Sequence, residues 1–382
     1  MTHPIRSRRS AQGFSLIELL VGMALMIVIV TAASVVYLNS RESDSSQARV
    51  SESIETGTFA LQLMERDVTQ AWSYPVVMPP ATVYALNAAA SAGTALLLQT
   101  YPPIGWNTEL PPAPYQVGLF GCDGGKFNST TGACDATTVL PGSPYRSPPD
   151  SLVINYFSSE AFTSTVGNRT DCNGADAGAD PVNAVRQLND TQQATGNVIN
   201  PTTRNADWPP AFPVFVSNRY ALTATSTEVD KQTVNTYSLS CNGNGANGSR
   251  VAAGTTNNYQ PLLLGVEDLQ ITYGAFDLDA NSTTGAMQPA PTRFYNATDA
   301  GSLPSITLDG VSYAGWSRIV AVRVCVMTRS LGNTRLNDKS GAARTYLDCT
   351  DDTPQPYGSS DRSIRTRSVQ VFAVRNRMNQ IY

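Results

Sequence analysis

A single carboxylate, Glu18, lies inside a predominantly apolar run that extends from Phe14 to Leu38. A charge at that depth of a membrane-length segment costs about 2.5–3.5 kcal/mol on insertion scales, so the acid needs a compensating partner. The run follows a basic stretch that contains three Arg and ends at Gly13, a small residue that a peptidase could cut. These residues therefore support two kinds of chemistry, namely cleavage at Gly13 and charge pairing of Glu18 with a cation.

The order of these features differs from that of an ordinary secretory signal, in which the apolar stretch precedes the cleavage site. A secretory signal peptidase would cut after Thr31-Ala-Ala33, which leaves Glu18 unexplained in the core of the signal. The Arg8-Arg9 pair is too weak to indicate a twin-arginine signal. Cleavage at Gly13 is therefore the favoured interpretation.

The segment Gly13-Phe-Ser-Leu-Ile-Glu-Leu19 resembles the class III leader of type IV pilins and pseudopilins. The resemblance implies that prepilin peptidase cuts between Gly13 and Phe14, and that Phe14 becomes the N-methylated terminus. It also makes Glu18 a buried acid used in assembly, paired with the Phe14 amine of a neighbouring subunit. Glu18 also lies four residues from the amine of its own chain and near the positive end of the helix dipole, so a local pairing stays open.

The residues after the apolar run predict that one helix continues beyond the membrane, because no Pro occurs before Pro75. An apolar stripe with alternating steps of four and three follows one helix face, at Val50, Ile54, Gly57, Leu61, Met64, Val68 and Ala71. We expect a single helix from Phe14 to about Ser73, ~90 Å long. The alternative is two separate helices, with Gly22 and Gly57 as flexible points.

The composition favours an exported β protein. Hydrophobic residues make up 41% of the 382 residues and charged residues only 15%, and Gly, Pro, Asn, Ser and Thr fill the difference. Such a composition fits a loop-rich protein outside the cytoplasm better than a helical cytosolic enzyme. The net charge is −4, and loss of the three leader Arg makes it −7. No nucleic-acid partner is therefore expected.

All six Cys lie beyond the apolar run, which indicates disulfides formed in an oxidising compartment such as a periplasm. None has C-x-x-C spacing, and the only His, His3, lies in the leader, so a zinc site is not expected. Six Cys allow fifteen pairings. Proximity in the sequence suggests the pairs Cys122–Cys134, Cys172–Cys241 and Cys325–Cys349.

Beyond Pro75 the chain shows short β-like runs between Pro-, Gly- and Asn-rich stretches. Four strands are predicted, at 151–157, at 265–273 after a turn, at 318–328 and at 364–374. In the third, Val320, Val322, Val324 and Val326 should face one way and Ala321, Arg323, Cys325 and Met327 the other. The stretches 75–118, 171–211 and 278–310 are expected to be long irregular loops.

The fold class is α+β. The expected organisation is a leader (1–13), a transmembrane half of the helix (14–38), its amphipathic half (39–74) and a β-rich head (75–382).

Later segments narrow the resemblance to the PilW-like minor pilins of the type IV pilus. They are the helical segment from Phe59 to Asp67, the segments 265–274 and 316–323, and the closing Val374-Arg-Asn-Arg377. The resemblance implies an inner-membrane protein with a single span and a periplasmic head, which later enters the pilus at the cell surface. Its implied partners are prepilin peptidase, the inner-membrane assembly platform, other minor pilins, the major pilin and a tip adhesin. It implies a role in priming assembly at the filament tip and hence in twitching motility. A head of roughly 300 residues favours low copy number at an end of the filament.

Two other functions stay open. A J-like minor pseudopilin at the tip of a type II secretion pseudopilus would act in protein export. A membrane-anchored binding protein that uses the helix only as a tether would not need Glu18.

Catalysis and cofactors are not expected. Without His3 the chain has no Ser–His or Cys–His pair, and it contains no G-x-S-x-G or Walker A motif, so we predict that it is not an enzyme. Asp277, Asp279 and Asn281 have the alternating oxygen spacing of a Ca²⁺ loop, but no Glu closes the motif, which favours a solvated turn.

Five Arg make the C-terminal region basic, either as a solvated strand face or as a docking edge for an acidic neighbour: Arg362, Arg365, Arg367, Arg375 and Arg377.

Overall fold

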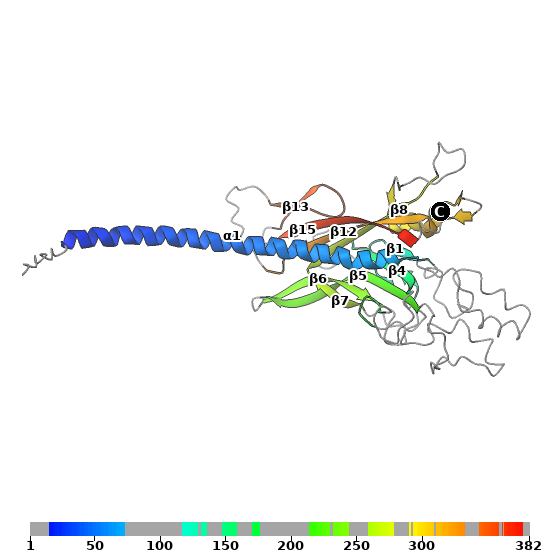
Figure 1. The fold of residues 1–382 in the computed structure, drawn as a ribbon, viewed down its shortest axis with the longest axis horizontal. Coiled ribbons are helices and arrows are strands. Elements are labelled where there is room, and N and C mark those ends of the chain that lie inside the picture. Colours follow the sequence, from blue (N-terminus) through cyan, green and yellow to red (C-terminus); the bar gives the residue numbers. More distant parts are fainter. Residues whose placement is uncertain are drawn as a thin grey trace, which may run out of the picture.

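The computed structural model contains one long helix and a β-rich head (Figure 1). Helix α1 (Leu16–Gln70) spans 55 residues, about 80 Å at the rise of an α-helix. The head contains two larger antiparallel sheets, of five and four strands. The α+β class is therefore confirmed. The structure describes residues 15–72, 117–128, 131–135, 147–158, 170–175, 214–229, 232–243, 259–278, 290–291, 293–308, 311–332, 344–358, 361 and 363–376.

Helix α1 is continuous, as the absence of Pro predicts, and the alternative of two helices is wrong. It passes through Gly22 and Gly57 without a break, so neither glycine is a hinge. It ends at Gln70 rather than near Ser73. Trp72 then adopts a left-handed backbone conformation with φ of 63°, which turns the chain out of the helix.

The buried face of α1 begins later than the apolar stripe suggested. Gly57, Leu61, Met64, Val68 and Ala71 are buried as expected, together with Ser53, Ala60 and Asp67, which the stripe omitted. Val50 and Ile54, by contrast, expose 37% and 47% of their surface. Val50 precedes Ser53, which is the first buried residue of α1. Ile54 lies in the first helical turn that the head buries, and of that turn only Ser53 and Gly57 are buried.

The four-stranded sheet has the order β15-β12-β8-β9 and lies against α1. Its strands are β8 (Val266–Ala275), β9 (Phe294–Tyr295), β12 (Ile319–Arg329) and β15 (Arg365–Ala373). Three of them confirm predicted strands. One detail of β12 differs, because its register with β8 shifts between Ile319 and Ala321. The resulting bulge sends Val320 to a small cluster with Phe276, Leu308 and Tyr313, whereas the other three Val enter the main core.

The five-stranded sheet has the order β1-β4-β5-β6-β7. Its strands are β1 (Leu119–Cys122), β4 (Ser151–Ser158), β5 (Val214–Val229), β6 (Gln232–Asn242) and β7 (Gln260–Leu264). Only β4 was predicted. The main core lies between this sheet, the four-stranded sheet and the second half of α1, because side chains from all three form one buried cluster.

Gly265 joins the two sheets. It connects β7 to β8 with φ of +79°, a conformation that L side chains rarely adopt. A Cβ at this position would also lie 2.8 Å from the carbonyl oxygen of Arg329. Glycine is therefore required where the chain leaves one sheet and enters the other.

Shorter elements complete the described part of the head. They are β2 (Phe127–Asn128), β3 (Ala133–Cys134), α4 (Ala297–Gly301), β10 (Ile306–Leu308), β11 (Val311–Tyr313), η4 (Gly315–Arg318), β13 (Thr345–Leu347) and β14 (Pro354–Pro356). The prediction of an irregular loop over 278–310 is wrong in its second half. There β9, α4 and β10 are formed, and Asn296 caps α4 by accepting the N–H of Asp299 at 2.7 Å. The other two predicted loops lie largely outside the described residues.

Candidate functional site: the N-terminal helix and its junction with the head

Glu18 takes part in a capping box at the start of α1. Its Oε2 accepts the backbone N–H of Ser15 at 3.0 Å, and the Ser15 hydroxyl accepts the N–H of Ile17 at 3.4 Å. These bonds satisfy groups that a helix start leaves open. Glu18 thus has a local role in the single chain. Its pairing with a neighbouring amine stays a prediction, and Gly13 and Phe14 lie outside the described residues.

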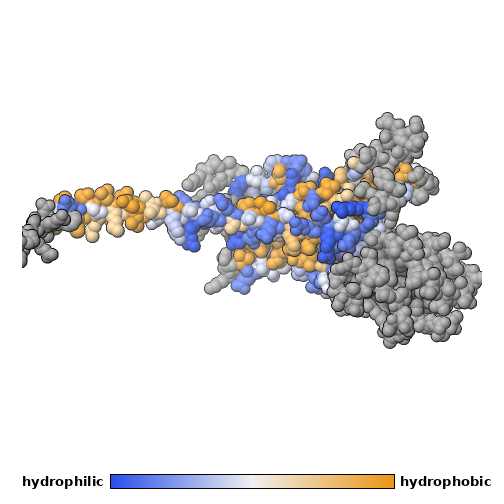
Figure 2. Space-filling view, in the orientation of Figure 1, coloured by the Kyte–Doolittle hydropathy of each residue, from blue (hydrophilic) through white to orange (hydrophobic). Residues whose placement is uncertain are grey.

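The first half of α1 exposes apolar side chains on all sides. Every large hydrophobic side chain from Leu16 to Leu38 exposes at least 52% of its surface. The helix is long and apolar enough to cross a membrane, and the space-filling view shows this half projecting from the head as an apolar rod (Figure 2). Such a surface is stable only in lipid or among other apolar helices.

The second half of α1 approaches the four-stranded sheet closely at two small residues. The hydroxyl groups of Ser53 and Thr328 lie 2.8 Å apart, and the Thr328 hydroxyl also donates to the Ser53 carbonyl oxygen at 2.9 Å. One turn further along, a Cβ on Gly57 would lie 2.6 Å from the Ser368 Oγ and 3.2 Å from its Cβ. The small size of these helix residues sets the distance between α1 and strands β12 and β15.

Gly57→Leu should lower the free energy of unfolding of the head by about 1–3 kcal/mol, the usual cost of overpacking. The gain in helix propensity, about 1 kcal/mol, is too small to offset the clash with Ser368. Gly22→Leu is the matched control, because nothing lies within 4 Å of a Cβ there. Urea unfolding in detergent, followed by tryptophan fluorescence to which the buried Trp72 contributes, measures both variants. An unchanged midpoint for Gly57→Leu would show that the helix is not packed this closely.

Asp67 links the helix to strand β5 of the other sheet. It is 1% exposed, and its Oδ2 accepts hydrogen bonds from the Tyr220 hydroxyl and the Asn218 Nδ2, each at 2.6 Å. Burial raises the pKa of this carboxyl, and the bonds from Tyr220 and Asn218 oppose that shift. Sequence reasoning missed this role. The available signal was a carboxylate within the otherwise uncharged buried face of the helix.

The C-terminal segment holds the last turn of α1. The Asn376 Nδ2 lies 3.2 Å from the carbonyl oxygens of Thr69, Gln70 and Ala71, which a helix end leaves without intrahelical partners. Together with Ser53, Gly57 and Asp67, this contact fixes the helix to both sheets. The helix and the head therefore form one unit from Ser53 onward.

The structure joins the six Cys in three disulfides, Cys122–Cys134, Cys172–Cys241 and Cys325–Cys349, which are the pairs suggested by proximity in the sequence.

Asp277, of the suggested Ca²⁺ loop, lies 3.5 Å from the guanidinium of Arg318, whereas Asp279 and Asn281 lie outside the described residues. No cluster of three or more metal-ligating side chains occurs within the described ranges.

The structure places the Arg residues of the predicted basic C-terminal region in different environments. Arg365 is 3% exposed at its side chain and pairs with Glu267 and Asp361, and Arg367 pairs with Asp352. A solvated strand face is therefore wrong for Arg365. Arg375 is exposed, and Arg362 and Arg377 lie outside the described residues.

Comparison with known proteins yields two family matches. Residues 227–376 match the family described as type IV pilus-assembly protein W, PilW, and residues 8–34 match the prokaryotic N-terminal methylation motif. No curated protein matches the chain. Among solved structures, a type IV-like pilin from Thermus thermophilus is similar at 11% identity, with 60% of this chain and 78% of that chain covered and a TM-score of 0.24. At that level the structural likeness carries no weight of its own.

Proposed function

We propose that this protein is a minor pilin that primes pilus assembly at the filament tip, because residues 227–376 match the PilW family of type IV pilus-assembly proteins and residues 8–34 match the N-terminal methylation motif. In this role the protein is a structural subunit and not an enzyme. The prepilin peptidase would cut it between Gly13 and Phe14 and methylate Phe14. The head would lie in the periplasm until the subunit enters the pilus.

One observation carries this proposal. The N-terminal methylation motif, at residues 8–34, overlaps an apolar helix half that is exposed on all sides, and that helix continues unbroken into the packed head. A tether needs only a membrane-spanning helix and a flexible connection. Here the second half of the same helix packs in the core of the head. A subunit moved from the bilayer into a bundle of helices would carry its head with it as one unit. There the Phe14 amine and Glu18 would compensate each other's charge in apolar surroundings.

The position at the tip is supported by size. A head of roughly 300 residues is large for a subunit that repeats along a thin shaft, which favours a few copies at one end. The proposed partners are the other minor pilins and the major pilin, through α1, with the inner-membrane assembly platform and a tip adhesin. A secretion pseudopilus gains no support, because the matched family is one of pilus assembly.

The test is to delete the gene and count surface pili and twitching cells. We expect the deletion to abolish or strongly reduce both, and the unaltered gene to restore them. Glu18→Ala should fail to restore them, because the buried amine loses its partner. The control is Glu55→Ala, which removes an exposed acid of the same helix beyond its apolar half and should restore piliation.

Mass spectrometry of the mature protein distinguishes processing from assembly. We expect a terminus at methylated Phe14 in both variants. Normal piliation without the gene, or a mature protein that retains its leader, would overturn the proposal.

A further inference from the structure

The β5–β6 hairpin extends beyond its neighbours in the five-stranded sheet (Figure 1). Strand β4 pairs with β5 only from Val214 to Tyr220, and β7 pairs with β6 only from Ser238 to Cys241. Within the described chain, residues 232–237 of β6 therefore pair with β5 alone. One backbone edge of this segment therefore has none of the described strands beside it.

The direction of the backbone groups defines this free edge. The carbonyl oxygen of Tyr237 accepts the N–H of Gly265 at 2.9 Å. The backbone N–H and C=O of Tyr237 therefore point to the side of β6 on which β7 lies. Because these groups alternate along a strand, Asn235 and Thr233 direct theirs to the same edge. Both residues are exposed. The turn at Gly265 takes the chain away into β8, so β7 itself does not extend along this edge.

The free edge lacks the features that normally prevent pairing with another chain. The segment Gln232–Tyr237 has six residues without a charge, Pro or Gly. Natural edge strands are commonly protected by charged residues, Pro or bulges. The opposite edge of the hairpin carries Glu228, and the edge strand β15 carries Arg365 and Arg367. The β6 edge is therefore suited to accept a strand.

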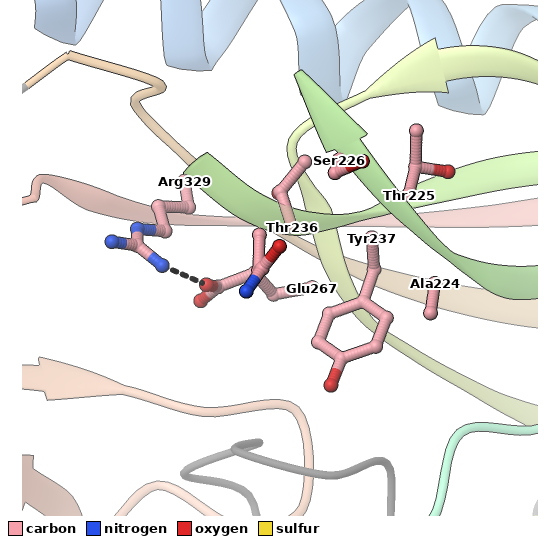
Figure 3. Close-up of a pocket in the computed structure, with 8 residues that line it drawn as sticks. Ala224, Thr225, Ser226, Thr236, Tyr237, Glu267 and Arg329 are labelled. Carbon is pink, nitrogen blue, oxygen red and sulfur yellow. Dashed lines mark hydrogen bonds and ion pairs between the residues drawn. The ribbon is translucent and has the colours of Figure 1, made fainter. Parts of the chain in front are cut away.

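A cavity of about 510 Å³, lined mainly by residues with polar or charged side chains, adjoins this edge (Figure 3). In Figure 3, Tyr237 and Ala224 project to one side of the hairpin and Thr225 to the other, as their register requires. Glu267 and Arg329, from strands β8 and β12, contribute an ion pair of 3.2 Å. The lining residues are Ala224, Thr225, Ser226, Asn235, Thr236, Tyr237, Glu267 and Arg329.

We propose that an extended segment of a neighbouring pilus subunit adds to β6 at Thr233 and Asn235 and places an uncharged polar side chain in this cavity. Backbone hydrogen bonds would supply affinity, and the cavity would supply specificity. The side chain should be an amide or a hydroxyl, because the carboxylates of Glu267 and Asp361 already balance the charges of Arg329 and Arg365, and a further charge would stay unpaired. This proposal rests on the proposed function, since it assigns part of the contact between subunits.

Proline substitution tests the two edges separately. Thr233→Pro removes an N–H on the β6 edge without removing a bond to β5, and Glu228→Pro removes the equivalent N–H of the opposite edge, since these two residues are partners in the register. Each variant, as the full chain, is co-expressed with the other minor pilins and purified in detergent. We expect Thr233→Pro to reduce recovery of the complex about tenfold, the effect of losing one or two hydrogen bonds. Glu228→Pro should leave recovery unchanged.

A second measurement distinguishes loss of strand pairing at the β6 edge from misfolding caused by the Pro substitution. A photo-cross-linking residue at Asn235 should join to an extended segment of a co-expressed minor pilin, identified by mass spectrometry, whereas the same residue at Glu228 should not. Equal recovery for both Pro variants, or no cross-link from Asn235, would overturn the inference. Loss of pili on gene deletion together with normal pili for Thr233→Pro would reject this inference alone and leave the proposed function intact.

Discussion

Replacement of Glu267 by Ala is expected to lower the free energy of unfolding of the head by about 3–5 kcal/mol, because it leaves buried positive charge uncompensated. Glu267 is 3% exposed, and its two carboxylate oxygens accept from Arg365 at 2.8 Å and from Arg329 at 3.2 Å. The Arg365 side chain is 3% exposed and cannot return to water without opening the sheet. Asp361 still pairs with Arg365, so part of the charge stays balanced.

The control for this prediction is Asp352→Asn. Asp352 also pairs with an Arg of strand β15, Arg367, but its side chain is 87% exposed. Ion pairs in contact with water contribute little, so this variant should stay within about 0.5 kcal/mol of the unaltered protein. Urea unfolding followed by tryptophan fluorescence measures both. A similar small effect for Glu267→Ala would show that water reaches Arg365 and that the ion pair is not truly buried.

Removal of the Cys172–Cys241 disulfide is expected to cost the most among the three bridges. The pairs are separated by 69, 24 and 12 residues for Cys172–Cys241, Cys325–Cys349 and Cys122–Cys134. Loop-closure entropy then assigns losses of about 4.5, about 3.5 and about 3 kcal/mol in that order. Three double Cys→Ser variants, compared by urea midpoint, test the ranking.

The ranking depends on how the bridges stabilise the head. If they act mainly by restricting the unfolded chain, the longest loop gives the largest loss. The reverse order, with Cys122–Cys134 most costly, would show that local packing around each bridge outweighs chain entropy.

Sequence patterns predicted those elements whose burial follows a simple period. The absence of Pro before Pro75 indicated the continuous helix, and alternating Val residues indicated β12. The Cys pairs were also found, because each bridge joins two Cys that are consecutive among the six, even though Cys172 and Cys241 are 69 residues apart. The helix and β12 depend on local sequence, so they are visible without the fold.

Other features arise from tertiary contacts that no local pattern records. The β5–β6 hairpin gathers Thr and Ser on one face, including the hydroxyl pairs Thr223–Ser240 and Thr225–Ser238, each at 2.6 Å. The apolar alternation of its other face, which includes Leu222 and Leu239, is short and gives way to polar residues toward the turn, so it does not indicate strands of this length. The role of Asp67 depends on partners more than 150 residues away. The exposure of Val50 and Ile54 reflects where the head ends, which the stripe alone does not indicate.

The lateral attachment of α1 has a mechanical consequence. Strands β12 and β15 run alongside the helix, and contacts at Ser53, Gly57 and Asn376 are distributed along it (Figure 1). A force that pulls on the first half of α1 along the helix axis would act on all of these contacts at the same time, in shear. It would not break them one after another. A subunit drawn out of a bilayer would therefore resist extraction of its own helix until several contacts fail together.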